Sequence, residues 1–133
     1  MSFPLKSFVL TSAFGPRTHP VTGDIKKFHY GIDLRAFNEP VFSVLDGRVV
    51  KAGFAPVIGN YVQVKSGDFL LTYGHLSLLL VISGQQVIAR DVVAISGESG
   101  CVTGPHLHFG VNYSGRSVNP LSFLSTLNNN LKH

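Results

Sequence analysis

Short apolar stretches separated by turn-forming residues dominate the pattern of hydrophobic and polar positions along this chain. Residues 60–65 alternate in polarity with a period of two, which is typical of a strand with one buried face. Residues 41–54 resemble a hairpin, because Asp46 and Gly47 form a tight-turn signal between two apolar runs. Further strands are expected at residues 7–14, 28–34, 69–75 and 105–112, with one strand or two at 87–96.

Glycine, proline and polar residues mark the breaks between these strands. Turns are expected at Gly15-Pro16 and at Gly67-Asp68, with loops at 18–27 and 97–104. The apolar stretch at 76–82 stops before a helix could form, so loop and strand are predicted there.

The end of the chain has the signature of a helix start. Asn119 suits the N-cap and Pro120 the first helical position, and four apolar side chains follow: Leu121, Phe123, Leu124 and Leu127. Short strands at close spacing, followed by one short helix, predict an all-β sandwich or open barrel. Since neither a linker nor a repeat is visible, a single domain is expected over residues 1–133.

Composition narrows the class of protein. The chain has 133 residues, of which 44% are hydrophobic, only 14% are charged and 14 are glycine. The low charge argues against disorder, and the many glycines argue against a helical bundle. Since no apolar stretch approaches the roughly 18 residues of a membrane-spanning helix, no transmembrane segment is expected.

The charge gives a weak indication of partners. Eleven basic and seven acidic side chains leave a net charge of +4 when the histidines are neutral, which suits ordinary solubility or an anionic partner. Only Lys26 and Lys27 are adjacent, and basic and aromatic residues do not alternate. Nucleic acid is therefore not expected as a partner, whereas an anionic cell wall fits the charge equally well.

The single cysteine and the N-terminus leave the compartment open. Cys101 has no partner for an intrachain disulfide. The first residues carry one lysine and a short apolar run, which falls short of a secretory signal. If the protein is exported, we expect its signal to lie outside this chain.

Two clusters of side chains carry the chemistry of a metal site. His29 and Asp33 lie four residues apart, so they share one face of an extended segment, and both are good zinc ligands. His106 and His108, two residues apart on a strand, also share a face, while Leu107 would anchor the opposite one. Taken singly, each cluster is also compatible with an ordinary polar surface.

Together with His75, which follows Gly74 at a strand end, the clusters predict a catalytic zinc site. Such a site needs three protein ligands and one open position. His29, Asp33 and one of His106 or His108 meet that count, and the spacing does not decide between the last two. The remaining histidines would serve proton transfer and transition-state stabilisation.

Other catalytic chemistries find less support in the sequence. The chain has neither a His-Glu-x-x-His helix nor a Gly-x-Ser-x-Gly elbow. Cys101 lies five residues before His106, but a lone cysteine in a glycine-rich loop lacks the electropositive setting of a nucleophilic thiolate.

These motifs, in this order, resemble those of the lysostaphin and LytM-type zinc metallopeptidases, which are peptidoglycan endopeptidases. The similar segments are Ser12–Arg17 with His19-Pro20 and Thr22-Gly23, His29-x-x-x-Asp33, Gly47–Val50, Gly59–Tyr61, Gly74-His75-Leu76, Ser99-Gly100 and Thr103–Phe109. One departure is Cys101-Val-Thr-Gly104, where the family usually has Ser-Thr-Gly.

The resemblance implies an assignment of the site. His29, Asp33 and His108 would bind one zinc ion, while His75 and His106 would act as unliganded catalytic residues. The implied fold is a mostly antiparallel duplicated-hybrid-motif sheet with a groove on its face. The site and the groove together would make the chain a metalloendopeptidase.

The resemblance also implies a setting for that activity. The partner would be a peptidoglycan peptide, cut by a monomeric enzyme in the periplasm or outside the cell. Arg17, Tyr61 and Tyr73 are candidates to line the groove, with a core role expected for at least one tyrosine. Since some relatives act as non-catalytic activators or scaffolds for other wall hydrolases, that function is the alternative.

Overall fold

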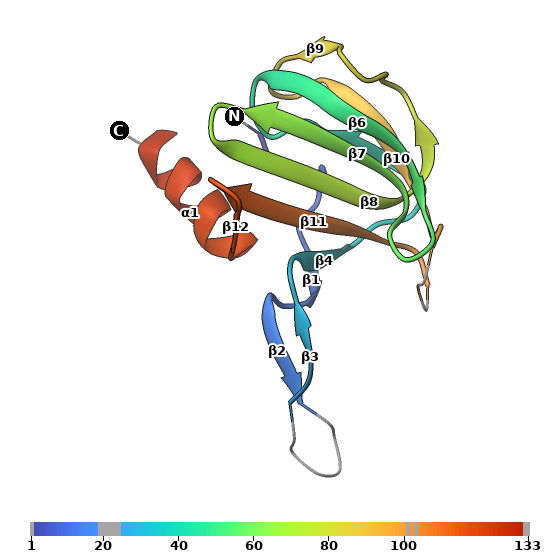
Figure 1. Ribbon diagram of the computed structural model, residues 1–133, viewed down its shortest axis with the longest axis vertical. Coiled ribbons are helices and arrows are strands. Elements are labelled where there is room, and N and C mark those ends of the chain that lie inside the picture. The colour runs from blue at the N-terminus through green and yellow to red at the C-terminus, as the bar shows by residue number, and fades with distance from the viewer. Residues whose placement is uncertain (1, 19–24, 101, 103, 132–133) are drawn as a thin grey trace.

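A computed structural model describes residues 2–18, 25–100, 102 and 104–131. One antiparallel sheet of ten strands forms the body of the protein, with the central order β1-β4-β11-β8-β7-β6-β9 (Figure 1). Its strands are β1 (Leu10–Ser12), β4 (Ile32–Arg35), β5 (Pro40–Phe42), β6 (Gly47–Ala55), β7 (Gly59–Ser66), β8 (Phe69–Leu79), β9 (Gln86–Val87), β10 (Val92–Ser96), β11 (His106–Tyr113) and β12 (Arg116–Val118). The predicted all-β class is confirmed, and the sheet is open rather than a closed barrel.

Two smaller elements flank this sheet. Strands β2 (Gly15–Thr18) and β3 (Ile25–His29) form a separate two-stranded sheet that projects from the body (Figure 1). Helix α1 (Pro120–Leu131) begins where the sequence predicts, with Asn119 Oδ1 accepting a hydrogen bond from the Leu121 N–H at 3.0 Å. Phe123 seats the helix by packing on Phe69, with ring centroids 5.0 Å apart. No helix in the described part of the chain is long and apolar enough to span a membrane.

Buried and partly exposed side chains alternate along the central strands, so one face of the sheet is apolar and the other is polar. In β11, Leu107, Phe109 and Val111 are buried, whereas His106 and His108 are only partly covered. The neighbouring strands continue the buried side, and the core contains Val62, Val64, Leu71, Tyr73, Ile32 and Leu34. Because side chains alternate in a strand, the opposite face of β11 is left for polar chemistry.

The predicted hairpin over residues 41–54 is wrong. Strand β5 pairs with β10, and β6 pairs with β7 and β9, so the two apolar runs have different partners. Gly47 is needed for a different reason: a Cβ there would lie 2.3 Å from the Lys65 carbonyl oxygen. The missing side chain at Gly47 allows β6 to approach β7 closely. In the sequence, a glycine needed for close packing looks the same as a glycine needed for a turn.

Other boundaries also differ from the predicted ones. Gly15 and Pro16, expected to form a turn, belong to β2, where a proline is tolerated because the strand is an edge. The expected strand at 28–34 is broken at Tyr30-Gly31 into the ends of β3 and β4. Strand β8 continues to Leu79, so residues 76–79 extend the strand where loop and strand are expected after His75. Part of the predicted loop 18–27, residues 19–24, lies outside the described residues.

Tyr73 is a core residue that holds a loop in place. Its side chain is fully buried and packs on Phe109, with ring centroids 5.4 Å apart. Its hydroxyl oxygen accepts a hydrogen bond from the backbone N–H of Val44, a buried residue, at 3.0 Å. The phenol therefore provides a partner for an amide that would otherwise lack one inside the protein.

Replacing this hydroxyl tests the packing of the core. We expect Tyr73→Phe to lower the free energy of unfolding by about 1–3 kcal/mol, because the Val44 amide is left without an acceptor. Tyr113→Phe, at a side chain that is 47% exposed, is the matched control and should change stability by less than about 0.5 kcal/mol. Urea unfolding followed by circular dichroism measures both, and equal stability of the two variants would contradict this role.

Candidate metal centre

The pairing of β4 with β11 places a carboxylate beside two imidazoles. In this register Asp33 lies opposite His108, and Arg35 lies opposite His106. Ile32, Leu34 and Leu107 are buried in the core, so the alternate residues Asp33, His106 and His108 share the other face. The predicted proximity of Asp33 to the His-x-His pair therefore follows from one strand pairing.

His29 reaches the same point from the other sheet. It is the last residue of β3, and the chain then passes through Tyr30 and Gly31 into β4. The expectation that His29 and Asp33 share one continuous extended segment is therefore wrong in its local geometry. The two side chains nevertheless meet, with His29 Nε2 3.4 Å from Asp33 Oδ1.

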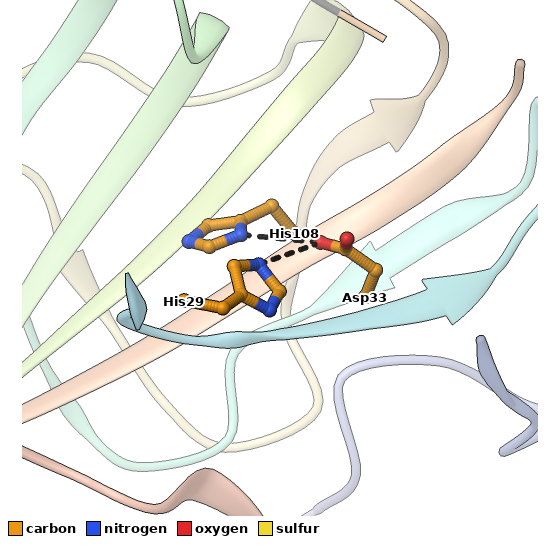
Figure 2. A group of neighbouring side chains, drawn as sticks. All are labelled: His29, Asp33 and His108. Atoms are coloured by element: carbon orange, nitrogen blue, oxygen red, sulfur yellow. Dashed lines mark hydrogen bonds and ion pairs between the residues drawn. The ribbon is translucent and has the colours of Figure 1, made fainter. Parts of the chain in front are cut away.

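Three side chains converge as a set that could bind a metal ion. One ligand atom from each of His29, Asp33 and His108 lies within 4.8 Å of the others (Figure 2). His108 Nδ1 is 3.2 Å from Asp33 Oδ1, and His29 Nε2 is 3.4 Å from the same oxygen. Ligands bound tetrahedrally to Zn²⁺ at about 2.0–2.1 Å are separated by about 3.3 Å, so both separations fit that ion.

Contacts around the ligands select the nitrogen that each imidazole presents. His29 Nδ1 lies 3.0 Å from the Ala13 carbonyl oxygen, to which it donates its proton. Nδ1 is thereby committed, so Nε2, which faces Asp33, is the nitrogen of His29 that can bind a metal. In His108 it is Nδ1 that faces Asp33. A hydrogen bond that fixes the tautomer in this way is a recurrent property of metal-binding histidines.

Asp33 remains ionised within this group. Burial alone would raise the pKa of its carboxyl. The hydrogen bonds from His108 and His29, with the charges of His29 and His106, outweigh burial and hold this pKa far below its usual range. The carboxylate is therefore available as an anionic ligand at neutral pH.

His75 and His106 form a second pair of imidazoles beside the ligands. Their rings are 4.9 Å apart, and the ring of His75 is 6.1 Å from that of His108. His106 Nε2 lies 3.7 Å from Asp33 Oδ1. All five predicted site residues, four histidines and one aspartate, are thus brought together over one face of the large sheet.

Both of these imidazoles are anchored through Nδ1. His75 donates to the Ser99 carbonyl at 2.8 Å, and His106 donates to the Gly104 carbonyl at 3.1 Å. Burial lowers the pKa of His75, which favours its neutral form. In the neutral form of each ring, Nε2 is then the nitrogen that can accept a proton, as a general base requires.

The predicted groove residues have different positions. Tyr73 faces the core, so it does not line the surface that carries the histidines. Tyr61 is partly buried on β7. The backbone of Arg17 lies in β2, but its side chain is outside the described part of the structure, and so is Cys101.

Gly31, inside the first metal motif, also contributes to the site, although it is not among the predicted catalytic and metal residues. A Cβ at this position would lie 2.6 Å from His108 Cε1 and 2.7 Å from the Phe109 carbonyl oxygen. The backbone of residue 31 thus forms the wall against which the His108 ring rests. Its position inside the His-x-x-x-Asp motif was the available signal.

Comparison with known proteins identifies this arrangement. The model of peptidase family M23 matches residues 27–120, which include all five site residues. The chain belongs to peptidase family M23. The resemblance to lysostaphin-type enzymes is thereby confirmed.

Individual relatives agree with this membership. The peptidoglycan DD-endopeptidase ShyA of Vibrio cholerae is 41% identical over 84% of this chain, which spans 26% of that protein. A zinc-containing peptidase from Vibrio cholerae superimposes with a TM-score of 0.82, at 37% identity, over 88% of this chain and 37% of that one. The catalytic domain of lysostaphin from Staphylococcus simulans gives 0.76, at 28% identity, over 89% and 92%. The chain spans about a quarter of the length of ShyA and of a similar curated relative from Haemophilus influenzae.

A methyl group at Gly31 tests the support of His108. We expect Gly31→Ala to weaken Zn²⁺ binding by about 10- to 100-fold, because the added carbon displaces a ligand ring. Gly53→Ala is the matched control, since nothing lies within 4 Å of a Cβ there. Competition with a chromophoric chelator measures both affinities. Unchanged affinity in Gly31→Ala would show that the ring of His108 is not a ligand or is not held by this contact.

Proposed function

We propose that this chain is a zinc-dependent endopeptidase that hydrolyses peptide bonds in bacterial cell-wall peptidoglycan. The observation that carries the proposal is the convergence of three side chains that could bind a metal with two anchored imidazoles. Relatives named as peptidoglycan DD-endopeptidases support the substrate class. A lost ligand would favour a non-catalytic scaffold or activator, and no ligand position is lost here.

The donor set suits zinc. His29 Nε2, an Asp33 oxygen and His108 Nδ1 would hold the ion, two nitrogens and one oxygen being a common catalytic set. When bound, zinc supplies a Lewis acid that polarises a carbonyl and lowers the pKa of water towards neutrality. The ionised Asp33 and the hydrogen bond from His29 to Ala13 prepare the ligands for that role.

The unliganded imidazoles would move the proton. Nε2 of His106 or His75 accepts a proton from the attacking water, because Nδ1 of each ring is already committed to a backbone carbonyl. The same nitrogen then returns the proton to the leaving amine. The other imidazole lies within 5 Å of the first, ring to ring, and helps to stabilise the charge that develops on the peptide oxygen.

The substrate class implies where the activity takes place. Since peptidoglycan lies outside the cytoplasmic membrane, we propose a periplasmic or extracellular site of action within the cell envelope. One copy of the chain holds all five site residues, which supports a monomeric enzyme in a single domain.

Digestion of purified peptidoglycan tests this function. We expect the zinc-loaded chain to release peptide fragments that mass spectrometry can identify, and a chelator to abolish the release. Asp33→Ala should bind no stoichiometric zinc and release no fragments, because the ligand shared by both histidines is removed. A folded protein that binds zinc but never cleaves would refute the enzyme and favour the scaffold.

Removing the unliganded imidazoles separates catalysis from metal binding. We expect His106→Ala and His75→Asn to lower kcat by about 10²–10⁴-fold while zinc stays bound in a one-to-one ratio. Asparagine is chosen at position 75 because that residue has a φ of 59°, which asparagine tolerates better than alanine. Elemental analysis and fragment release measure the two properties, and full activity in both variants would refute the assigned roles.

A further inference from the structure

Strand β8 is irregular at His75. Gly74 and His75 lie between the paired residues Tyr73 and Leu76, whereas β7 has the single residue Tyr61 at the corresponding place. This is a β-bulge, and His75 adopts a φ of 59°, in the left-handed region that side chains other than glycine rarely adopt. Bulges of this kind redirect a side chain, and strained residues persist only where the surroundings hold them.

The hydroxyl of Ser99 joins the two strands at this bulge. Ser99 Oγ accepts a hydrogen bond from the Asn60 N–H at 2.9 Å and donates one to the Leu76 carbonyl at 2.6 Å. Asn60 and Leu76 are partners in the ladder between β7 and β8. The serine thus connects an amide of one strand to a carbonyl of the other, next to the residue that is out of register.

The carbonyl of the same serine holds the imidazole. His75 Nδ1 donates its proton to the Ser99 carbonyl at 2.8 Å, while the His75 backbone N–H donates to Ile58 at 2.8 Å. Backbone and ring of His75 are therefore both fixed. The ring contact leaves Nε2 as the proton acceptor.

Close packing prevents Ser99 from shifting. A Cβ on Gly59 would lie 2.4 Å from the Ser99 carbonyl carbon, and one on Gly100 would lie 2.5 Å from the Gly59 nitrogen. Both glycines also have positive φ angles, 71° and 81°. The backbones of the two segments therefore touch, and this packing acts together with the two hydrogen bonds of the Ser99 hydroxyl to place its carbonyl beside His75.

We propose that Ser99 is a positioning residue for His75: its hydroxyl supports the bulge and its carbonyl selects the Nδ1–H tautomer. The inference rests on the proposed role of His75 in catalysis. Ser99 belongs neither to the proposed metal ligands nor to the catalytic histidines. Its role would be to orient His75 so that Nε2 faces the substrate. Within the described part of the chain, the hydrogen bonds of Ser99 reach Asn60, Leu76 and the Nδ1 of His75, so it acts on the reaction through His75.

Ser99→Ala, compared with Ser77→Ala, tests the proposal. Ser77 is a matched control because its Oγ also donates to a backbone carbonyl, that of Ser96 at 2.9 Å, in the neighbouring strand. We expect Ser99→Ala to lower kcat by about 10- to 100-fold with unchanged KM and zinc content, as outer supports of a site typically do. Ser77→Ala should stay within about twofold of the parent protein, as surface changes usually do.

A spectroscopic readout separates positioning from general destabilisation. Long-range ¹H–¹⁵N correlation spectra of the zinc-loaded protein report the tautomer of His75. We expect the Nδ1–H form alone in the parent protein and in Ser77→Ala, and a mixture with the Nε2–H form in Ser99→Ala. An unchanged tautomer and kcat in Ser99→Ala, or loss of zinc along with activity, would overturn the proposal.

The outcomes distinguish this inference from the proposed function. If the parent protein cleaves no peptidoglycan, the function fails, yet the tautomer spectra still decide the role of Ser99. If Ser99→Ala does not fold, the parent spectrum decides alone, because an Nε2–H form of His75 there contradicts the hydrogen bond to Ser99.

Discussion

The register of β11 between β4 and β8 is the constraint on which the site depends. It sets His108 opposite Asp33 on one side and opposite Gly74 on the other, next to His75. Because successive side chains of a strand point to opposite faces, a slip of one residue would turn Leu107 and Phe109 out of the core and the histidines into it. The burial of Leu107, Phe109 and Val111 therefore fixes the catalytic geometry as well as the fold. Stability and function use alternate residues of the same strand.

Backbone carbonyls hold the imidazole rings of three site histidines in place. Ala13, Ser99 and Gly104 each accept the Nδ1 proton of one histidine. Each of these carbonyls belongs to a segment that lies between strands. The connecting segments therefore determine which ring nitrogen of each histidine carries the proton, while the strands determine where His106 and His108 lie. The Nε2 atoms of His29 and His106 lie at different distances from the Asp33 carboxylate, 3.4 Å and 3.7 Å respectively.

Some of this arrangement could be predicted from the sequence because it depends on local alternation. The His106-x-His108 pair, the helix start at Asn119 and the turn at Gly67-Asp68 are short-range features. The choice of His108 over His106 as ligand came only from the family resemblance, since spacing treats them alike. The partners of β5 and β6 could not be predicted, because Gly47 serves a close approach to Lys65 that no local pattern encodes. The role of Ser99 likewise depends on a contact 24 residues away from His75.

The separate sheet of β2 and β3 gives the metal a structural consequence. His29 comes from this small sheet, whereas Asp33 and His108 come from the large one. An ion held by all three residues would act as a cross-link between two sheets that share no strand. Part of its binding free energy would then appear as stability of the junction, so that metal binding and the attachment of the β2–β3 sheet would be thermodynamically coupled.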